Sequence, residues 1–168
     1  MEELLEVINE HGDVINILPR SVIHGNPSFM HRVAHVLVFD QTGDLLLQKR
    51  SLNKDVAPGK WDTSVGGHVN PGETLLDAAR RETAEELGLS QCEPEFIYSY
   101  VHSNPYETEL VFTHSCVCFG EISFNREEID EVRYWSTRDI LQSLGTGVFS
   151  DNFEHEIKMY LKYKGSVK

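Results

Sequence analysis

One predicted helix constrains this chain more than any other feature. The run GGHVNPGETLLDAARRETAEELGL, residues 66–89, opens with a Gly-Gly pair and a Pro-Gly turn and continues with helical periodicity. We expect a helix over Glu73–Leu87, ended by Gly88, because glycine readily adopts the left-handed conformation that ends helices. Its apolar stripe, spaced by three and four residues, consists of Leu76, Ala79, Thr83 and Leu87.

Three glutamates, Glu82, Glu85 and Glu86, crowd the C-terminal end of this helix. Their spacing places them on one face, where like charges cost about 0.2–0.5 kcal/mol per pair. The helix dipole adds roughly 0.3–1 kcal/mol for each anion in the last turns. Two interpretations follow: a solvated face tied down by Arg80 and Arg81, or an oxygen site for Mg²⁺ or Mn²⁺ that cancels the repulsion. Because Mg²⁺ usually binds a few carboxylates together with phosphate oxygens, the second interpretation implies a phosphate-bearing substrate.

The remainder of the chain predicts strands and a few short helices, without an internal repeat or linker. An amphipathic helix is expected first, over Glu2–Glu10, with Leu4, Leu5 and Ile8 on one side. Expected strands cover 14–18, 32–40, 44–50, 61–65, 95–101, 110–119 and 132–136, and short helices cover 137–144 and 151–163. Strands in both hairpin and crossover order favour a mixed sheet with helices on both faces.

The helix and the turn before it resemble the Nudix box, G-x5-E-x7-R-E-U-x-E-E-x-G-U, in which U is a bulky aliphatic residue. The chain supplies every fixed position: Gly67, Glu73, Arg81, Glu82, Glu85, Glu86, Gly88 and Leu89. Its one departure is the β-branched Thr83 at the first U position. By this resemblance the chain is identified as a member of the Nudix (MutT-like) hydrolase family. The implied fold is an α/β (α+β) Nudix sandwich, with a mixed central sheet flanked by helices. We expect a single domain over 1–168, with residues 1–30 as an N-terminal extension packed on it and the box at 67–89.

The resemblance also implies a metal site and catalytic residues. The implied ligands of Mg²⁺, for which Mn²⁺ can substitute, are Gly67 (through its carbonyl), Glu82, Glu85 and Glu86. Arg81 and Glu73 match the box positions of an orienting ion pair, so the expected catalytic set is Glu73, Arg81, Glu85 and Glu86. Nudix enzymes cleave a nucleoside diphosphate linked to a group X by attack of water on phosphorus, and a nucleoside di- or triphosphate is our preferred substrate. The base is a box glutamate or a carboxylate from a neighbouring strand or loop.

A second pattern narrows the branch of the family. The pattern R-x3-K-x3-P-G-x-W, here Arg50, Lys54, Pro58, Gly59 and Trp61, is similar to that of isopentenyl-diphosphate isomerases. Those isomerases use a metal site of histidines and glutamates and a cysteine in a C-G-H arrangement, where this chain reads Gly66-Gly67-His68. Because glycine has no side chain to move a proton, a hydrolase is favoured. An isomerase-like enzyme acting on isoprenoid diphosphates is the alternative, and a Nudix-like binding module without catalysis is a third hypothesis.

Residues outside the box give a candidate substrate-binding set: Arg50, Lys54, His68, Glu107 and Glu109. The two basic residues suit a phosphate clamp, or they are ordinary surface charge. His68 binds metal or substrate, or it hydrogen-bonds within its loop. The two glutamates, in an E-x-E pattern, provide a metal ligand or the base, or they form a solvated strand edge. His31 is a further match to the isomerase metal site, but its alternation with apolar residues favours a structural role.

The charge balance excludes one class of partner. The 15 Lys+Arg against 27 Asp+Glu give a formal charge of −12, whereas a nucleic-acid surface needs clustered cations. No apolar run approaches the roughly 20 residues that span a bilayer, and the acidic start is unlike a signal peptide. We therefore expect a cytoplasmic protein that binds a small-molecule diphosphate, without nucleic acid or membrane; a homodimer is left open. Cys92, Cys116 and Cys118 are expected to be reduced structural thiols, the last two on one side of a strand.

Overall fold

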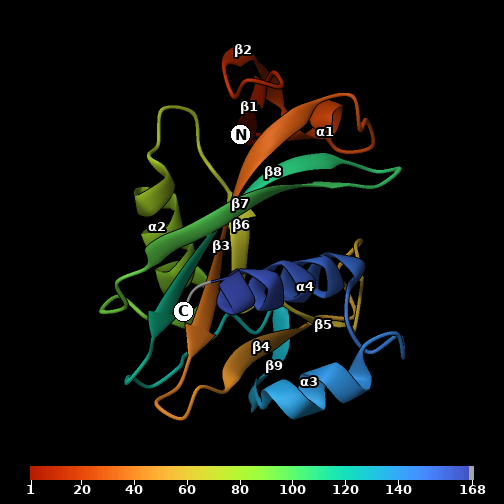
Figure 1. Cartoon of the computed structure of the whole chain (residues 1–168). Helices are drawn as coiled ribbons and strands as arrows, with labels where there is room; N and C mark the ends of the chain where they lie inside the picture. The colour runs from red at the N-terminus through yellow and green to blue at the C-terminus, as the bar shows by residue number, and fades with distance from the viewer. Residues whose placement is uncertain (167–168) are drawn as a thin grey trace.

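The computed structural model describes residues 1–166, and nine strands of this range form one mixed sheet between helical layers (Figure 1). The central strand β3 (Met30–Phe39) runs parallel to β8 (Thr108–Val117) and antiparallel to β6 (Val65–His68). β7 (Glu95–Ser103) extends the sheet beyond β8 as an antiparallel neighbour. The predicted mixed sheet flanked by helices is confirmed.

β3 and β4 (Leu45–Arg50), the strands predicted over 32–40 and 44–50, follow each other as a hairpin. They pair at a single residue pair next to the turn and then diverge. β4 pairs instead with β9 (Ile129–Trp135) and with the short strand β5 (Trp61–Asp62). The single strand predicted over 61–65 is therefore wrong, because the chain changes partner from β4 to β3 between β5 and β6. Residues from both diverging strands line the cleft described below.

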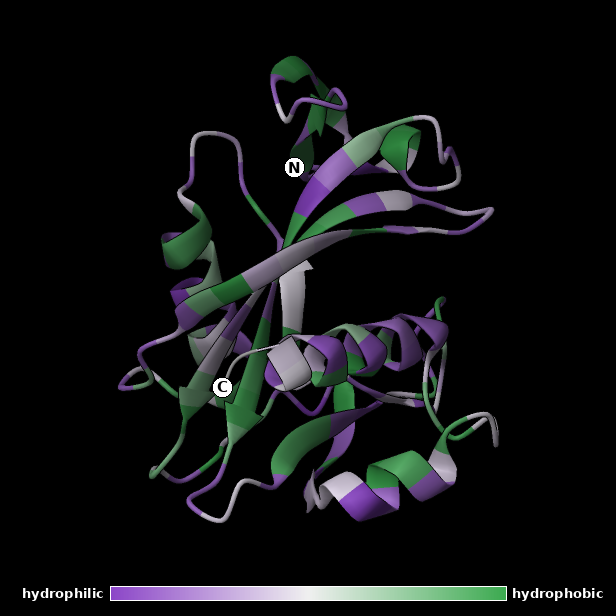
Figure 2. Ribbon diagram, in the orientation of Figure 1, coloured by the Kyte–Doolittle hydropathy of each residue, from purple (hydrophilic) through white to green (hydrophobic). Residues whose placement is uncertain are grey.

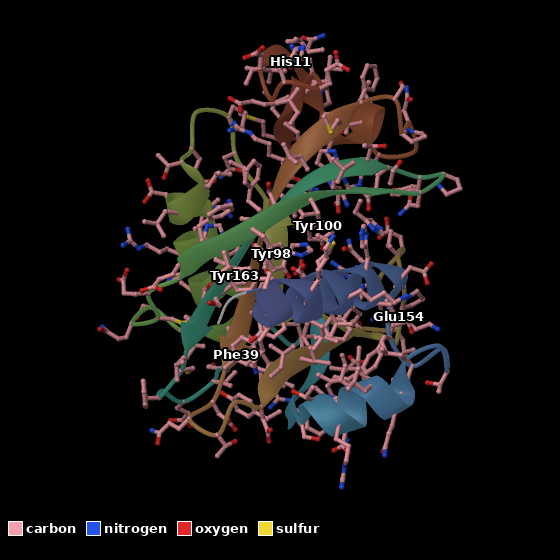
Figure 3. The ribbon with its side chains drawn as sticks, viewed as in Figure 1. His11, Phe39, Tyr98, Tyr100, Glu154 and Tyr163 are labelled. Carbon is pink, nitrogen blue, oxygen red and sulfur yellow. A yellow bond between two sulfur atoms is a disulfide. The ribbon has the colours of Figure 1, made fainter. Side chains whose placement is uncertain are left out.

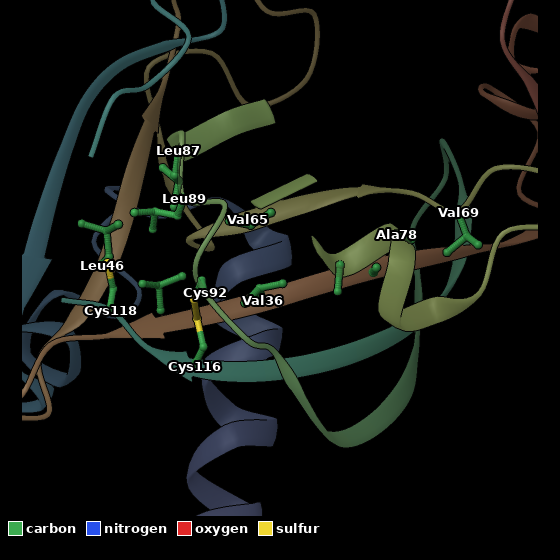
Figure 4. Packing of buried hydrophobic residues seen from close by; sticks show 13 residues of the cluster. Val36, Leu46, Val65, Val69, Ala78, Leu87, Leu89, Cys92, Cys116 and Cys118 are labelled. Atoms are coloured by element: carbon green, nitrogen blue, oxygen red, sulfur yellow. A yellow bond between two sulfur atoms is a disulfide. The ribbon is translucent and has the colours of Figure 1, made fainter. Parts of the chain in front are cut away.

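α2 (Leu75–Leu87) covers one face of the sheet, and its caps follow from the sequence. The Thr74 side chain accepts a hydrogen bond from a backbone N–H of the first turn, and Gly88 ends the helix at a φ of 67°. The buried face differs from the predicted stripe at one position. Leu76 is exposed, and Ala78 is buried in its place. Figure 4 shows the hydrophobic cluster that Ala78 and Leu87 of α2 form with buried residues of the sheet.

α3 (Thr137–Ser143) and α4 (Asp151–Ser166) lie on the opposite side of the sheet from α2 (Figure 1). Alternation along β3 separates the two cores, since Val36 packs in the cluster with α2 and Leu37 packs in the cluster with α3 and α4. Figure 2 shows hydrophobic residues along the buried parts of β3 and β4. Within the described range, no helix is long and apolar enough to cross a bilayer.

The N-terminal segment is a β-hairpin followed by one helical turn, so the helix predicted over Glu2–Glu10 is wrong. Its elements are β1 (Leu4–Ile8), β2 (Val14–Pro19) and α1 (Arg20–Ile23). β1 pairs with β2 and also with the start of β3. Leu5 and Val7 are buried together, whereas Leu4 is exposed. The short apolar pattern fits both periods, and pairing with β3 decides for the strand.

The cysteines also correct the prediction. Cys92 and Cys116 form a disulfide that joins the segment after α2 to β8 (Figure 4), so the expectation of three reduced thiols is wrong for this pair. Cys118 is free and buried. Cys116 and Cys118 contribute to the same core cluster, as their spacing predicts. The sequence does not predict that Cys92 pairs with Cys116, because only the tertiary fold brings the segment that carries Cys92 beside β8.

Candidate active site

A cleft of about 900 Å³ opens between the diverging strands. Its walls come from β3, β4, β6, α2, the start of β8 and the first turn of α4, so segments far apart in the sequence meet there. This volume suits a ligand the size of a nucleotide. Of the predicted site residues, those that line the cleft are Arg50, Lys54, Gly67, His68, Glu82, Glu86, Glu107 and Glu109. Glu73, Arg81 and Glu85 lie outside its lining.

Glu86 is the most perturbed carboxyl group of the cleft. It accepts a hydrogen bond from Gln48 Nε2 at 2.8 Å and a longer one from the Gly66 N–H at 3.4 Å. Burial, and next the negative charge of Glu82, raise the pKa of Glu86 to about 8. No cation contacts its carboxyl group in the described part of the chain. Glu86 is therefore a carboxyl group that lacks a positive partner.

Gly67 lies directly against the carboxyl group of Glu82. A Cβ atom on Gly67 would overlap this group, so any other residue here would displace the Glu82 carboxylate from its present position. The Glu82 side chain is mostly buried, and burial raises its pKa, although the adjacent Arg81 lowers it. The structure thus brings Gly67, Glu82 and Glu86 to one wall of the cleft.

Arg81 does not line the cleft, but it hydrogen-bonds to several groups of the box. Its guanidinium makes a bidentate ion pair with Glu73, at 2.8 and 3.0 Å, and donates to the His68 carbonyl at 2.9 Å and to Glu82 at 2.6 Å. The hydrogen bond from Arg81 lowers the pKa of Glu73. Glu85 contacts Arg81 at 3.4 Å, but 60% of its side chain is exposed. The helix face predicted to hold three glutamates therefore brings two of them into the cleft.

A cluster of histidines and glutamates adjoins the same cleft, and all its members except the buried His31 line it. Its members are His24, His31, His68, Glu107 and Glu109. In residues 1–166 they make two overlapping groups that share His31, each with ligand atoms within 4.8 Å of one another. The His24 and His68 Nε2 atoms are 3.2 Å apart, and His24 Nε2 lies 3.6 Å from Glu107. The box carboxylates form no such group within the described residues.

The electrostatics of this cluster suit a bound cation. Burial lowers the pKa of His24 to about 4 and that of His31 to about 3, so both imidazoles are neutral at pH 7. Burial, followed by the charge of Glu109, raises the pKa of Glu107 to about 7. Both ring nitrogens of His31 and the Nδ1 of His24 are buried without a hydrogen-bond partner. Such orphaned nitrogens beside carboxylates match the donor set of a divalent metal.

Basic side chains also line the cleft. Arg50 donates through Nε to the Val56 carbonyl at 2.8 Å and lies 3.5 Å from Asp62. Lys54 is 3.8 Å from Glu128. Both residues line the cleft, so their charges lie on the same cavity as the carboxylates. This arrangement suits the phosphate oxygens of a ligand.

The sequence prediction missed His24 and Gln48. His24 ends α1 and His31 lies on β3, so the two residues share no element and no local pattern identifies His24. Gln48 lies within an apolar strand, where its amide is buried and donates to Glu86. The segment between α1 and β3 carries His24 into the cleft.

Comparison with known proteins gives consistent results. A family model described as the NUDIX domain matches residues 29–155. The chain is similar to an isopentenyl-diphosphate Delta-isomerase of Streptomyces griseus, with 33% identity over 156 residues, or 88% of this chain and 78% of the relative. It is also similar to the Nudix hydrolase YfcD of Escherichia coli, with 32% identity over 141 residues, or 82% of this chain and 76% of the relative. The fold matches the crystal structure of DR0079 from Deinococcus radiodurans, with a TM-score of 0.79 at 22% identity, over 94% of this chain and 98% of that one.

Proposed function

Because the chain belongs to the Nudix hydrolase family, we propose that it is a Mg²⁺-dependent pyrophosphohydrolase. Its substrate is a nucleoside diphosphate linked to a group X, or a nucleoside di- or triphosphate, and water attacks phosphorus. The observation that carries this proposal is the pair of carboxyl groups of Glu82 and Glu86 on one wall of a cleft that also holds cationic side chains.

The chain's own residues fit a divalent cation at this wall. Glu86 lacks a positive partner, and the charge of Glu82 adds to the cost of ionising it. The Gly67 carbonyl, Glu82 and Glu86 would hold the cation, with the exposed Glu85 as the outer member of the set. When bound, the cation supplies neutralising charge to the diphosphate.

The remaining residues position the substrate. Arg81, fixed by its bidentate pair with Glu73, holds the Glu82 carboxylate and the His68 carbonyl in place. Arg50 and Lys54, which line the same cleft, bind phosphate oxygens. A pyrophosphohydrolase requires such orientation together with charge stabilisation, because these two effects carry most of the rate of phosphoryl transfer.

The histidine and glutamate cluster supports a second cation position in the same cleft. Imidazole ligands favour a transition metal such as Mn²⁺ over Mg²⁺. The buried, unpartnered nitrogens of His31 and the neutral state of its imidazole suit this role. His68 belongs to this cluster and follows Gly67 in the chain, so the two cation positions lie on neighbouring residues.

Phosphate release from a panel of nucleotides and nucleotide-linked diphosphates tests the proposal. A coupled phosphatase assay is run with Mg²⁺, with Mn²⁺ and with chelator. We expect metal-dependent turnover of one substrate class, reduced at least about 100-fold in Glu86→Gln. The matched control is Glu127→Gln, which alters an exposed carboxylate outside the cleft lining and should retain full activity. Turnover that survives chelator, or that is unchanged in Glu86→Gln, would overturn the proposal.

The second candidate is an isopentenyl-diphosphate isomerase-like enzyme acting on isoprenoid diphosphates. The histidine and glutamate cluster and the likeness to the Streptomyces griseus protein favour it. Gly66 argues against isomerisation, because it offers no side chain to move a proton. Deuterium from D₂O in the carbon skeleton of isopentenyl diphosphate would establish an isomerase, whereas phosphate release from that compound would extend the hydrolase proposal to isoprenoids.

We also propose that residues 1–168 form one Nudix domain with the N-terminal extension packed on it. The pairing of β1 with β3 and the contact of His68 Nδ1 with Glu3 at 3.0 Å support this assignment. The cytoplasmic location and the homodimer option stay predictions from the sequence.

A further inference from the structure

α4 carries a carboxylate in the middle of its buried face. Glu156 has an exposed fraction of 0%, and Phe153 and Ile157 of the same helix are buried in the core beside it. Placing an ionised carboxylate there is costly unless its oxygens are fully hydrogen-bonded. Glu156 therefore needs hydrogen-bond partners within the core.

Three side chains from three strands converge on Glu156. The Tyr98 hydroxyl donates to it at 2.9 Å, and the Thr113 hydroxyl donates at 2.8 Å. His35 Nδ1 lies 3.1 Å from the carboxylate and is its ion-pair partner within the described residues. Figure 3 labels Tyr98 between β7 and α4, consistent with this contact. Because an ionised carboxylate only accepts, His35 donates from Nδ1, which leaves Nε2 as the other functional atom of the ring.

The Nε2 side of His35 faces the cleft next to Gly66. His35 and Gly66 are paired residues of β3 and β6, and both line the cleft. A Cβ atom on Gly66 would lie 3.2 Å from His35 Nε2, so glycine leaves open the space into which this nitrogen points. Nε2 makes no hydrogen bond to another described residue. The buried carboxylate of Glu156 holds the His35 ring through Nδ1. The free nitrogen, Nε2, therefore reaches the cavity that contains Glu86.

We propose that His35 is the proton acceptor for the attacking water, and that Glu156 is its positioning residue. The inference rests on the proposed hydrolase function and adds to it the identity of the base. The water oxygen forms a bond to phosphorus while the bond from phosphorus to the leaving phosphate oxygen breaks. One water proton passes to Nε2, and the leaving phosphate takes the bonding electron pair. Nδ1 keeps its proton on Glu156 throughout, and the imidazolium then releases the added proton to solvent.

Several charged groups set the pKa of His35. Burial lowers it, but the hydrogen bond and the negative charge of Glu156 on α4 outweigh this effect, so the pKa lies above the usual value. Glu109 on β8 and Asp62 on β5 raise it further. The other titratable rings around His35 are those of His102 on β7 and His114 on β8. The neutral ring is the active form, so kcat should rise with pH through the pKa of His35.

The test compares His35→Gln and Glu156→Gln with His114→Gln. His114 is also buried, forms side-chain hydrogen bonds only with the backbone carbonyls of His35 and Phe112 and does not line the cleft, so it controls for the loss of a core histidine. We expect kcat to fall about 100-fold or more in His35→Gln with little change in KM, and to stay within about twofold in His114→Gln. In the pH profile of Glu156→Gln, the plateau of kcat should fall. The ascending limb should move to lower pH, because the negative charge that raises the pKa of His35 is lost. A merely structural role for Glu156 would leave the limb where it is.

A second measurement does not depend on turnover. Nitrogen-15 spectra of wild-type protein report the tautomer of His35, assigned by its loss in His35→Gln, before and after addition of Mg²⁺ with inorganic pyrophosphate. We expect the proton on Nδ1 and a shift of the Nε2 resonance on addition. Wild-type protein without turnover of any substrate would refute the hydrolase proposal alone. At a pH on the plateau of kcat, where the ring is neutral, a proton on Nε2 or an Nε2 resonance that ignores pyrophosphate would refute the assignment of His35, as would full activity in His35→Gln.

Discussion

Replacing Glu86 by glutamine should stabilise the metal-free protein while it removes activity. In the folded chain the pKa of Glu86 is about 8, against an ordinary value of 4.5. A carboxyl group whose pKa is raised by folding ionises more easily when the chain unfolds, so stability is lost as pH rises from about 4.5 through about 8. Glutamine keeps the shape and accepts the same hydrogen bonds without this cost.

The size of the effect follows from the same two values. At pH 7 the unfolded carboxyl group is fully ionised and the folded one is mostly protonated. The interval from 4.5 to 7, at about 1.4 kcal/mol per pH unit, gives an upper limit of about 3 kcal/mol gained by Glu86→Gln. For a domain of this length that corresponds to a rise in Tm of roughly 6–12 °C. At pH 4.5 the gain should nearly vanish.

Thermal unfolding in EDTA at several pH values measures this difference. Glu85→Gln is the matched control, because its side chain is 60% exposed and should show no comparable dependence on pH. Added Mg²⁺ should raise the Tm of wild-type protein much more than that of Glu86→Gln, because the cation binds only the ionised group. If Glu86→Gln is less stable than wild type in EDTA at pH 7, or if Mg²⁺ stabilises both proteins equally, the assignment of Glu86 is wrong.

Four further predictions address other parts of the site and fold. Arg81→Lys cannot make the bidentate ion pair and should lower kcat roughly 10- to 100-fold in steady-state assays; unchanged kcat would deny it an orienting role. His31→Asn should weaken Mn²⁺ binding at least about tenfold, measured by electron paramagnetic resonance of free Mn²⁺. Binding to wild type should strengthen as pH rises through about 7, where Glu107 ionises, and a flat pH profile would contradict this. Reduction of Cys92–Cys116 should lower the stability to denaturant by about 3 kcal/mol, and an unchanged midpoint would exclude that contribution.

The sequence predicts what local spacing determines. The box helix can be predicted because its two caps and its three glutamates lie close together in one continuous segment of the chain. Thr74 and Gly88 cap it close to the expected positions. The same spacing argument places Glu82 and Glu86 on one face, and both line the cleft. It does not reveal that Glu85 stays at the solvent edge of that face, because the position of neighbouring strands decides which side chains are covered.

The remaining site residues come together through tertiary pairing. His24 reaches the cleft directly after α1, which follows a hairpin whose first strand was expected to be a helix. His35 and Glu156 lie 121 positions apart, on a central strand and the C-terminal helix, and no spacing rule connects them. The disulfide between Cys92 and Cys116 is a similar case. Contacts of this kind depend on strand order, which a single sequence does not specify.

The most direct test of the central claim is the position of oxygen incorporated from water. The preferred substrate is turned over with Mg²⁺ in H₂¹⁸O, and the products are examined by phosphorus-31 NMR and mass spectrometry. Water attack on phosphorus predicts one ¹⁸O atom in a phosphate product, no label in the group X, and no labelling in the presence of chelator. Product that lacks ¹⁸O on phosphorus, or label found on the carbon of X, would contradict a Nudix hydrolase mechanism for this chain.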